Sequence, residues 1–320
     1  MAGRRQKKSG RRSYAWRYRG RIVACVFVEV IIICALVIMI GWNKGVKEWF
    51  EQFEQPVLKE VDISGINSPN AILMQARGGK ILGEINGEAQ IYPASMTKIM
   101  TVILGIENFD NLDEKITLTD EMFAGLYEQD ATQAGFQPGE EVRVIDLLYG
   151  AMLPSGAECC IALADTISGS EADFAELMNK KARKLGMENT HFCDSTGLHN
   201  PDHYSTVKDI AVLMKYCIKN DTFREIVETS RHSTGVTNIH PDGITYYSTM
   251  FKNLSDPTVT GGKILGGKTG YTSEAGHCLV SFAEIEGREY IFVSAGASGA
   301  DGNTIPHIQD AVTVYNRVGA

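Results

Sequence analysis

The stretch Tyr92–Met100 reads YPASMTKIM and places Ser95 three residues before Lys98, at the head of an apolar run. Residues three apart on a helix share a face, so a helix that begins near Ser95 would set its hydroxyl beside the Lys98 amine. A serine hydroxyl needs an adjacent base to act as a nucleophile, and Lys98 can be that base only when it is neutral. Burial and a second nearby cation would both favour the neutral amine.

The chain holds one Lys-Thr-Gly sequence, Lys268-Thr269-Gly270, within GGKTGYTSEAGHCLV. On a strand, this sequence offers an ammonium group, a hydroxyl and open backbone, which suit a peptide carboxylate bound along a strand edge. Gly270 would let such a ligand approach the backbone closely. Lys268 is also a candidate for the second cation that would keep Lys98 neutral.

A third element, Ser155-Gly156, lies in a break between two apolar segments that read as helices. Ser-x-x-Lys alone is a weak signal, because Ser205 and Lys208 repeat it. Together with a Ser-containing middle element and Lys-Thr-Gly, however, it forms the constellation of the penicillin-interacting serine enzymes. The combination of Ser95, Ser155 and Lys268, in that order, is therefore far more specific than its parts.

Hydrophobic periodicity and turn residues predict early strands, a middle run of helices and late strands. Helices enclosed between early and late strands favour an α/β (α+β) body whose antiparallel sheet is flanked by helices. The segment 189–205 is rich in turn residues and is expected to be a loop. The predicted strands are 71–76, 80–85, 263–271, 277–285 and 289–297, and the predicted helices are 95–106, 141–153, 157–167, 171–186, 206–219 and 303–318.

The N-terminal region predicts a membrane anchor. Residues 1–21 hold nine Lys or Arg and no acid, and the apolar segment 22–42 is long enough to span a bilayer as a helix. The basic flank places the N-terminus in the cytoplasm and the body outside, in a single-pass protein of the cell membrane. A cleaved signal peptide is the alternative, but no Ala-x-Ala-like site follows closely. We expect a basic cytoplasmic tail at 1–21, a transmembrane anchor at 22–42 that contacts the lipid bilayer, a stalk at 43–64 and the folded domain at 65–320.

Charge and cysteine usage exclude several classes of protein. The tail contributes +9 to a net charge of −8, so the remainder carries −17, which argues against nucleic acid as a partner. The seven cysteines contain no CxxC pair, so we expect neither a zinc site nor a disulfide framework, and Cys159 and Cys160 are expected in the core. His199 and His203 are four apart, but Pro201 lies between them and no HExxH glutamate is present, so no metal and no cofactor is predicted.

The sequence resembles the D-alanyl-D-alanine carboxypeptidases, the low-molecular-mass penicillin-binding proteins, through IYPASMTKIMT, NTHFCDSTGLHNPDHYST and GGKTGYTSEAGHCLV. The resemblance runs from about Ala71 to the C-terminus. It implies a penicillin-binding or serine β-lactamase-like fold with an all-helical subdomain. It also implies a serine peptidase of cell-wall peptidoglycan biosynthesis and cell shape, which removes the terminal D-alanine from stem pentapeptides through an acyl-enzyme. β-Lactam antibiotics would be covalent inhibitors.

The resemblance also implies a role for each site residue. Ser95 would be the acylated nucleophile, Lys98 its base, and Ser155 the relay of the proton toward the leaving group. Lys268 and Thr269 would hold the substrate's terminal carboxylate, beside Gly270. The backbone amides of Ser95 and Tyr271 would form the oxyanion hole.

Two departures from the family pattern keep other functions open. The family's middle motif is usually Ser-x-Asn, but Ala157 stands in the place of the asparagine, and Glu158 follows it. Many relatives also carry a C-terminal β-domain and a C-terminal amphipathic anchor, whereas this sequence ends just after the catalytic body. One alternative is a weakly active relative that binds penicillin or senses peptidoglycan. The other is a β-lactamase, which would need a deacylating glutamate, and Glu176 with Asn179 only loosely resembles that element.

Overall fold

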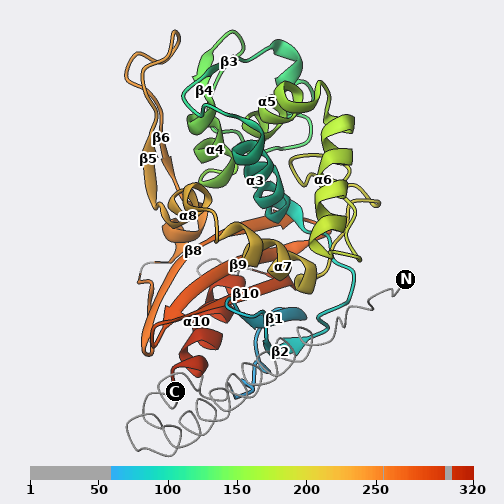
Figure 1. Ribbon diagram of the computed structural model, residues 1–320, viewed down its shortest axis with the longest axis vertical. Helices are drawn as coiled ribbons and strands as arrows, with labels where there is room; N and C mark the ends of the chain where they lie inside the picture. Colours follow the sequence, from blue (N-terminus) through green and yellow to red (C-terminus); the bar gives the residue numbers. More distant parts are fainter. Residues whose placement is uncertain (1–58, 255, 300–304) are drawn as a thin grey trace, which may run out of the picture. The chain divides into compact units, whose positions relative to one another are not determined.

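A six-stranded antiparallel sheet joins the earliest described strands to the latest ones in this computed structural model, which describes residues 59–254, 256–299 and 305–320. Its order is β2-β1-β10-β9-β8-β7, and β8, β9 and β10 form a meander (Figure 1). The predicted antiparallel sheet of early and late strands is confirmed. Its strands are β1 (Asn70–Gln75), β2 (Ile81–Ile85), β7 (Thr258–Val259), β8 (Gly262–Thr272), β9 (Gly276–Ile285) and β10 (Arg288–Ala297).

The turn between β9 and β10 fixes the register of the central hairpin. It consists of Glu286 and Gly287, which have φ angles of 51° and 71°. Two positive φ values in a two-residue loop are the mark of a type I′ turn, whose twist matches that of paired strands. As a result, Ile285 pairs with Arg288 and the ladder continues to Leu279 opposite Ser294.

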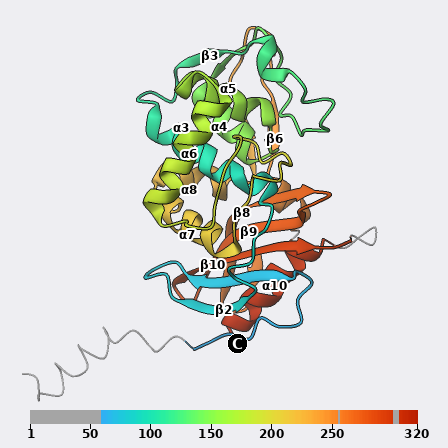
Figure 2. The same cartoon turned by 90° about the vertical axis from the view of Figure 1, so that its right-hand side faces the viewer.

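Helices cover both faces of the sheet (Figures 1 and 2). α10 packs against β9 and β10 on one face, where the Tyr315 hydroxyl contacts Ser281 Oγ and the amide of Phe292. α7 packs against β1 and β10 on the other face, where Ile291 and Val293 join the main core. Neighbouring residues of β10 therefore serve opposite faces, as strand geometry requires. The helices include α6 (Glu171–Leu185), α7 (Val207–Cys217), α8 (Asp221–Glu228), α9 (Thr249–Asn253) and α10 (Pro306–Val318).

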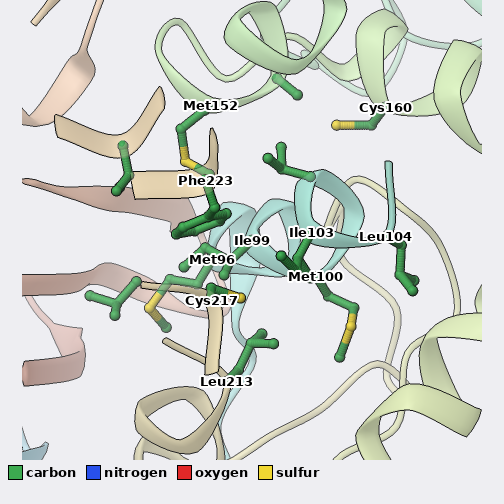
Figure 3. Packing of buried hydrophobic residues seen from close by; sticks show 14 of the residues in the cluster. Met96, Ile99, Met100, Ile103, Leu104, Met152, Cys160, Leu213, Cys217 and Phe223 are labelled. Carbon is green, nitrogen blue, oxygen red and sulfur yellow. The ribbon is translucent and has the colours of Figure 1, made fainter. Parts of the chain in front are cut away.

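The helical part of the molecule is built around α3 (Lys98–Asn108), which continues from the 3₁₀ helix η1 (Ala94–Thr97). The helices α4 (Val144–Met152) and α5 (Ala157–Ser168) pack against α3, as does α7 from the sheet side. Figure 3 shows apolar side chains of η1, α3 and their neighbours pointing into this shared core. The first two turns of α3 are buried on every side, and their polar side chains, Lys98 and Thr101, donate to the backbone carbonyls of Thr196 and Ser195.

Several elements differ from the sequence prediction or were missed by it. Residues 141–143 were expected to open a helix, but they form β4 (Glu141–Arg143), which pairs with β3 (Lys115–Thr117) before α4 begins. The helix α8 and the projecting hairpin of β5 (Arg231–Ser233) and β6 (Thr245–Tyr247) were not predicted. Each strand of the hairpin has three residues with polar groups on both faces, so no apolar alternation marks it.

The predicted tail at 1–21 and the predicted anchor at 22–42 lie outside the described residues. Within the described ranges, no helix is both long and apolar enough to cross a membrane. The end of the predicted stalk lies against the body: the Val61 amide donates to the Leu82 carbonyl at 2.7 Å, and Arg317 donates to the carbonyls of Asp62 and Ser64 at 2.8 Å each.

Candidate active site

Ser95 lies in the 3₁₀ turn that leads into α3, whereas the sequence predicted an α-helix from Ser95 onward. The difference matters because side chains three apart eclipse one another in a 3₁₀ helix. The Lys98 Nζ accordingly lies 3.1 Å from Ser95 Oγ. Ala94, just before the serine, has a φ of 46°, an uncommon value for a residue with a Cβ. The chain therefore bends sharply at the serine and leaves it half-buried.

Lys98 is enclosed by protein and only 3% exposed. Besides Ser95, its Nζ donates to the backbone carbonyl of Thr196 at 2.6 Å. Thr196 lies in the predicted loop 189–205, which in the structure folds over the start of α3. This contact could not be predicted from the sequence, because a backbone carbonyl leaves no signal in a residue pattern.

Ser155 occupies the break between α4 and α5 and has a φ of 75°, a strained conformation for a non-glycine residue. Two backbone hydrogen bonds hold it there: the amide of Gly156 donates to Gly150 and the amide of Ala157 donates to Thr132, both at 2.8 Å. The strain turns the serine toward β8, where its Oγ accepts a hydrogen bond from Lys268 Nζ at 2.9 Å.

Lys268 is 1% exposed and also donates to the carbonyl of Thr269 at 2.9 Å. Burial and the neighbouring charge of Lys98 both lower the pKa of Lys268 well below its ordinary value. The positive charge of Lys98 therefore adds to burial in disfavouring a proton on Lys268. An anion bound beside Lys268 would favour its charged form.

Beyond Lys263 the outer edge of β8 has no strand partner among the described residues, because β7 pairs only with its first two residues. Gly270 brings this edge against the nucleophile turn: a Cβ there would lie 3.0 Å from the amide nitrogen of Ser95. Thr269 Oγ1 lies 2.7 Å from Thr249 Oγ1 at the start of α9, and the next side chain, Tyr271, is 61% exposed.

Glu158, next to the unusual Ala157, points away from Ser155 and into the preceding loop. Its Oε1 accepts from the amides of Ala134 and Gly135 at 2.6 and 3.0 Å, and its Oε2 has no hydrogen-bond partner among the described residues. Burial raises the pKa of this carboxyl, although the backbone hydrogen bonds oppose the shift. Glu158 therefore fastens the loop that in turn holds Ala157.

The remaining candidates have structural environments. Cys159 and Cys160 lie in the core, and burial raises the pKa of Cys160 to about 12, so its thiol stays protonated. His199 packs edge-on against Tyr92, while His203 points to Thr97, and the two histidines share no ligand position. Across residues 59–254, 256–299 and 305–320, no cluster of three or more potential ligands is positioned for a metal ion.

Comparisons with known proteins give the family of the chain. The peptidase S11 family model, described as D-alanyl-D-alanine carboxypeptidase, matches residues 57–299. The D-alanyl-D-alanine carboxypeptidase DacF of Bacillus subtilis is 35% identical over 233 residues, which cover 72% of this chain and 57% of DacF. The corresponding enzyme of Streptomyces sp. strain K15 is 37% identical over 205 residues, which cover 62% of this chain and 69% of that enzyme.

The fold matches as well. The crystal structure of the Streptomyces K15 DD-transpeptidase superposes with a TM-score of 0.71 at 29% identity, over 81% of this chain and 99% of that chain. The match to DacF spans little more than half of that relative's length. The family match itself covers most of the described body, including Ser95, Ser155 and Lys268. The chain belongs to the peptidase S11 family of D-alanyl-D-alanine carboxypeptidases.

Proposed function

We propose that this protein is a membrane-anchored serine D,D-carboxypeptidase that removes the terminal D-alanine from peptidoglycan stem pentapeptides. The observation that carries the proposal is the pair of contacts at one site: Lys98 Nζ to Ser95 Oγ at 3.1 Å and Lys268 Nζ to Ser155 Oγ at 2.9 Å. The first contact supplies a nucleophile with a base, and the second supplies a hydroxyl joined to a proton source.

Acylation follows from these positions. The substrate's terminal carboxylate approaches Lys268 and Thr269, and its charge favours the ammonium form of Lys268. Burial and the nearby Lys98 lower the pKa of Lys268, so the bound carboxylate offsets part of the cost of its charge. Lys98 takes the Ser95 proton as Oγ attacks the carbonyl of the penultimate D-alanine. The amides of Ser95 and Tyr271 receive the developing oxyanion.

Collapse of the tetrahedral intermediate breaks the peptide bond. The leaving nitrogen takes a proton from the Ser155 hydroxyl, which is replenished from Lys268 Nζ, and free D-alanine departs. The proton that Lys98 took from Ser95 passes to Lys268, which leaves both lysines as they began. Water then attacks the Ser95 ester, Lys98 accepts a proton from the water and donates it to Ser95 Oγ as the ester bond breaks, and the shortened peptide is released. A β-lactam ring opens in the same acylation step but leaves no departing fragment, so the adduct persists.

Localisation is part of the proposal and rests on the sequence. The basic residues 1–21 and the apolar segment 22–42 support a single-pass anchor with a cytoplasmic N-terminus. The catalytic domain would then face the cell wall, where its substrate is found. Protease protection of the N-terminal tail in right-side-out membrane vesicles, with digestion of the body, would test this orientation.

The activity is tested by incubating the full-length protein with a peptide ending in D-Ala-D-Ala and measuring free D-alanine. Release of one D-alanine per peptide supports the carboxypeptidase. A persistent penicillin adduct without peptide turnover would support a sensor instead, and rapid hydrolysis of penicillin would support a β-lactamase. Glu176, the residue that loosely resembles a deacylating glutamate, lies exposed on α6, so the geometry does not favour the last outcome.

A further inference from the structure

Thr97, His203 and Asp194 form a hydrogen-bonded chain directly behind the nucleophile turn. Thr97 Oγ1 lies 2.9 Å from His203 Nε2, and His203 Nδ1 lies 3.2 Å from Asp194 Oδ2. The order of hydroxyl, imidazole and carboxylate is that of a serine-protease triad. However, the side chains of Thr97 and His203 are buried, so no substrate reaches the hydroxyl. These three side chains therefore have a structural role and do not contact the substrate.

The Asp194 carboxylate faces the imidazole of His203. Burial alone would raise the pKa of Asp194, but the hydrogen bond and charge of His203, with the hydrogen bonds from Thr196 and Gly197, lower it to about 2. A carboxylate only accepts, so Nδ1 presents an N–H to Asp194 while Nε2 faces the Thr97 hydroxyl. The amide of Cys193 also approaches Nδ1, but at 3.3 Å, which is weaker than a charge-assisted bond.

The other oxygen of Asp194 shapes the turn that follows it. Oδ1 accepts hydrogen bonds from the amide and hydroxyl of Thr196 and from the amide of Gly197, all at 2.7 Å. This turn directs the Thr196 carbonyl to Lys98 Nζ at 2.6 Å. Since Lys98 follows Thr97 in the chain, the contacts close a ring that starts and ends at the beginning of α3.

Gly197 allows this ring to pack directly against the backbone of the nucleophile turn. Its φ is 79°, and a Cβ at this position would lie 1.9 Å from the Ala94 carbonyl oxygen and 2.7 Å from Thr97 Oγ1. Only glycine fits so close an approach. A shift of the loop would therefore move the Thr196 carbonyl relative to Lys98 and Ser95 together.

We propose that Thr97, His203 and Asp194 are positioning residues that hold the Thr196 carbonyl against Lys98 and so aim its Nζ at the nucleophile. A neutral amine has two N–H groups and one lone pair. With one N–H fixed on the Thr196 carbonyl, the lone pair is free to face the Ser95 hydroxyl. The inference rests on the proposed function, because it gives the ring a purpose in the activation of Ser95.

The test uses Thr97→Val, which removes the hydroxyl with little change of shape, and Thr97→Ser, which restores it. The full-length variants are mixed with increasing concentrations of a fluorescent penicillin, and the limiting acylation rate and the half-saturating concentration are measured. We expect Thr97→Val to lower the limiting rate by about tenfold to hundredfold, the scale of a small misplacement of catalytic groups. The half-saturating concentration should change little, and Thr97→Ser should regain most of the rate.

A second variant and a matched control separate positioning from stability. His203→Gln keeps a group that can reach Thr97 but loses the bond to Asp194, so it should show the same fall in limiting rate. Thr190→Val is the control, because Thr190 Oγ1 bonds Asp209 at 2.8 Å in the same loop but outside the ring. It should lower the melting temperature while keeping the rate of folded protein.

Equal limiting rates in Thr97→Val, His203→Gln and Thr190→Val, measured per folded molecule, would overturn this inference alone. Absence of any acylation in the unmodified protein would overturn the proposed function, and this inference with it. The two failures are therefore distinguishable in one set of measurements.

Discussion

At the scale of single residues, the chemistry depends on the surroundings of two lysines. Lys98 and Lys268 are both buried, and each contacts a different serine. Burial and the charge of Lys98 lower the pKa of Lys268, while Lys98 itself lies within reach of the Ser95 proton. Elsewhere in the chain the same Ser-x-x-Lys spacing has no such setting: Lys208 is partly exposed and pairs with Glu88.

This contrast gives a matched pair of substitutions. Lys98→Ala should slow acylation by penicillin on the order of 10²–10⁴-fold, because it removes the group that accepts the Ser95 proton. Lys208→Ala removes the lysine of the repeated motif and should leave the rate unchanged. Stopped-flow or gel-based labelling with a fluorescent penicillin measures both rates. An unchanged rate in Lys98→Ala would remove Lys98 as the base.

Substitution of Glu158 tests how the unusual middle motif is supported. Glu158→Ala leaves the amides of Ala134 and Gly135 without their acceptor and should cost about 2 kcal/mol of unfolding free energy. Glu158→Gln keeps an acceptor oxygen of the same reach and should stay close to the wild type. Urea denaturation measures both values. Equal destabilisation by the two substitutions would show that charge, rather than the two hydrogen bonds, is what matters at this position.

At the scale of elements, the site forms where a 3₁₀ turn, a helix break and a strand edge meet. Ser95 comes from η1, Ser155 from the gap between α4 and α5, and Lys268 from β8. The late hairpin and the strand position of Lys268 could be predicted, since two apolar runs separated by the two turn residues Glu286 and Gly287 mark the hairpin. The 3₁₀ turn could not, because a Pro-led apolar run also fits an α-helix. The contacts of Lys98 with the Thr196 carbonyl and of Thr269 with the Thr249 hydroxyl could not be predicted either, because no sequence motif marks them.

The close approach of β8 to η1 makes Gly270 a sensitive position. In Gly270→Ala the added methyl group would lie 3.0 Å from the Ser95 amide nitrogen, so the strand and the turn must separate by a few tenths of an ångström. We expect acylation to slow by roughly tenfold or more. Gly235→Ala is a suitable control, because a Cβ there comes no nearer than 3.7 Å to the neighbouring Arg143 side chain. Equal acylation rates in the two variants would mean that this contact does not hold the site.

At the scale of the whole molecule, one sheet carries the site on the face that α7 covers and a buried histidine on the face that α10 covers. His307 lies in the first turn of α10, stacks on His277 with 5.0 Å between ring centroids, and leaves its Nδ1 without a hydrogen-bond partner among the described residues. Burial and the neighbouring His277 lower the pKa of His307 from 6.5 to about 4. The sequence placed His277 at the start of a strand, but the contact with His307 depends on the docking of α10, which only the folded chain reveals.

The shifted pKa predicts a pH-dependent stability. Between pH 6.5 and about 4 the unfolded chain binds a proton at His307 and the folded protein does not, so stability falls as the pH falls through this window. The loss should reach at most about 3 kcal/mol. His307→Phe keeps a ring for the stack and should flatten the dependence, as measured by melting temperature from pH 4 to 7. An identical slope in the variant and the wild type would assign the effect to other groups.

The central claim is that Ser95 is the nucleophile, activated by Lys98 and presented beside β8. The most direct test is mass spectrometry of the full-length protein after treatment with penicillin, followed by mapping of the modified peptide. The account predicts one adduct of the antibiotic's mass on Ser95 and none in Ser95→Ala. An adduct on any other residue, or labelling that survives Ser95→Ala, would contradict it.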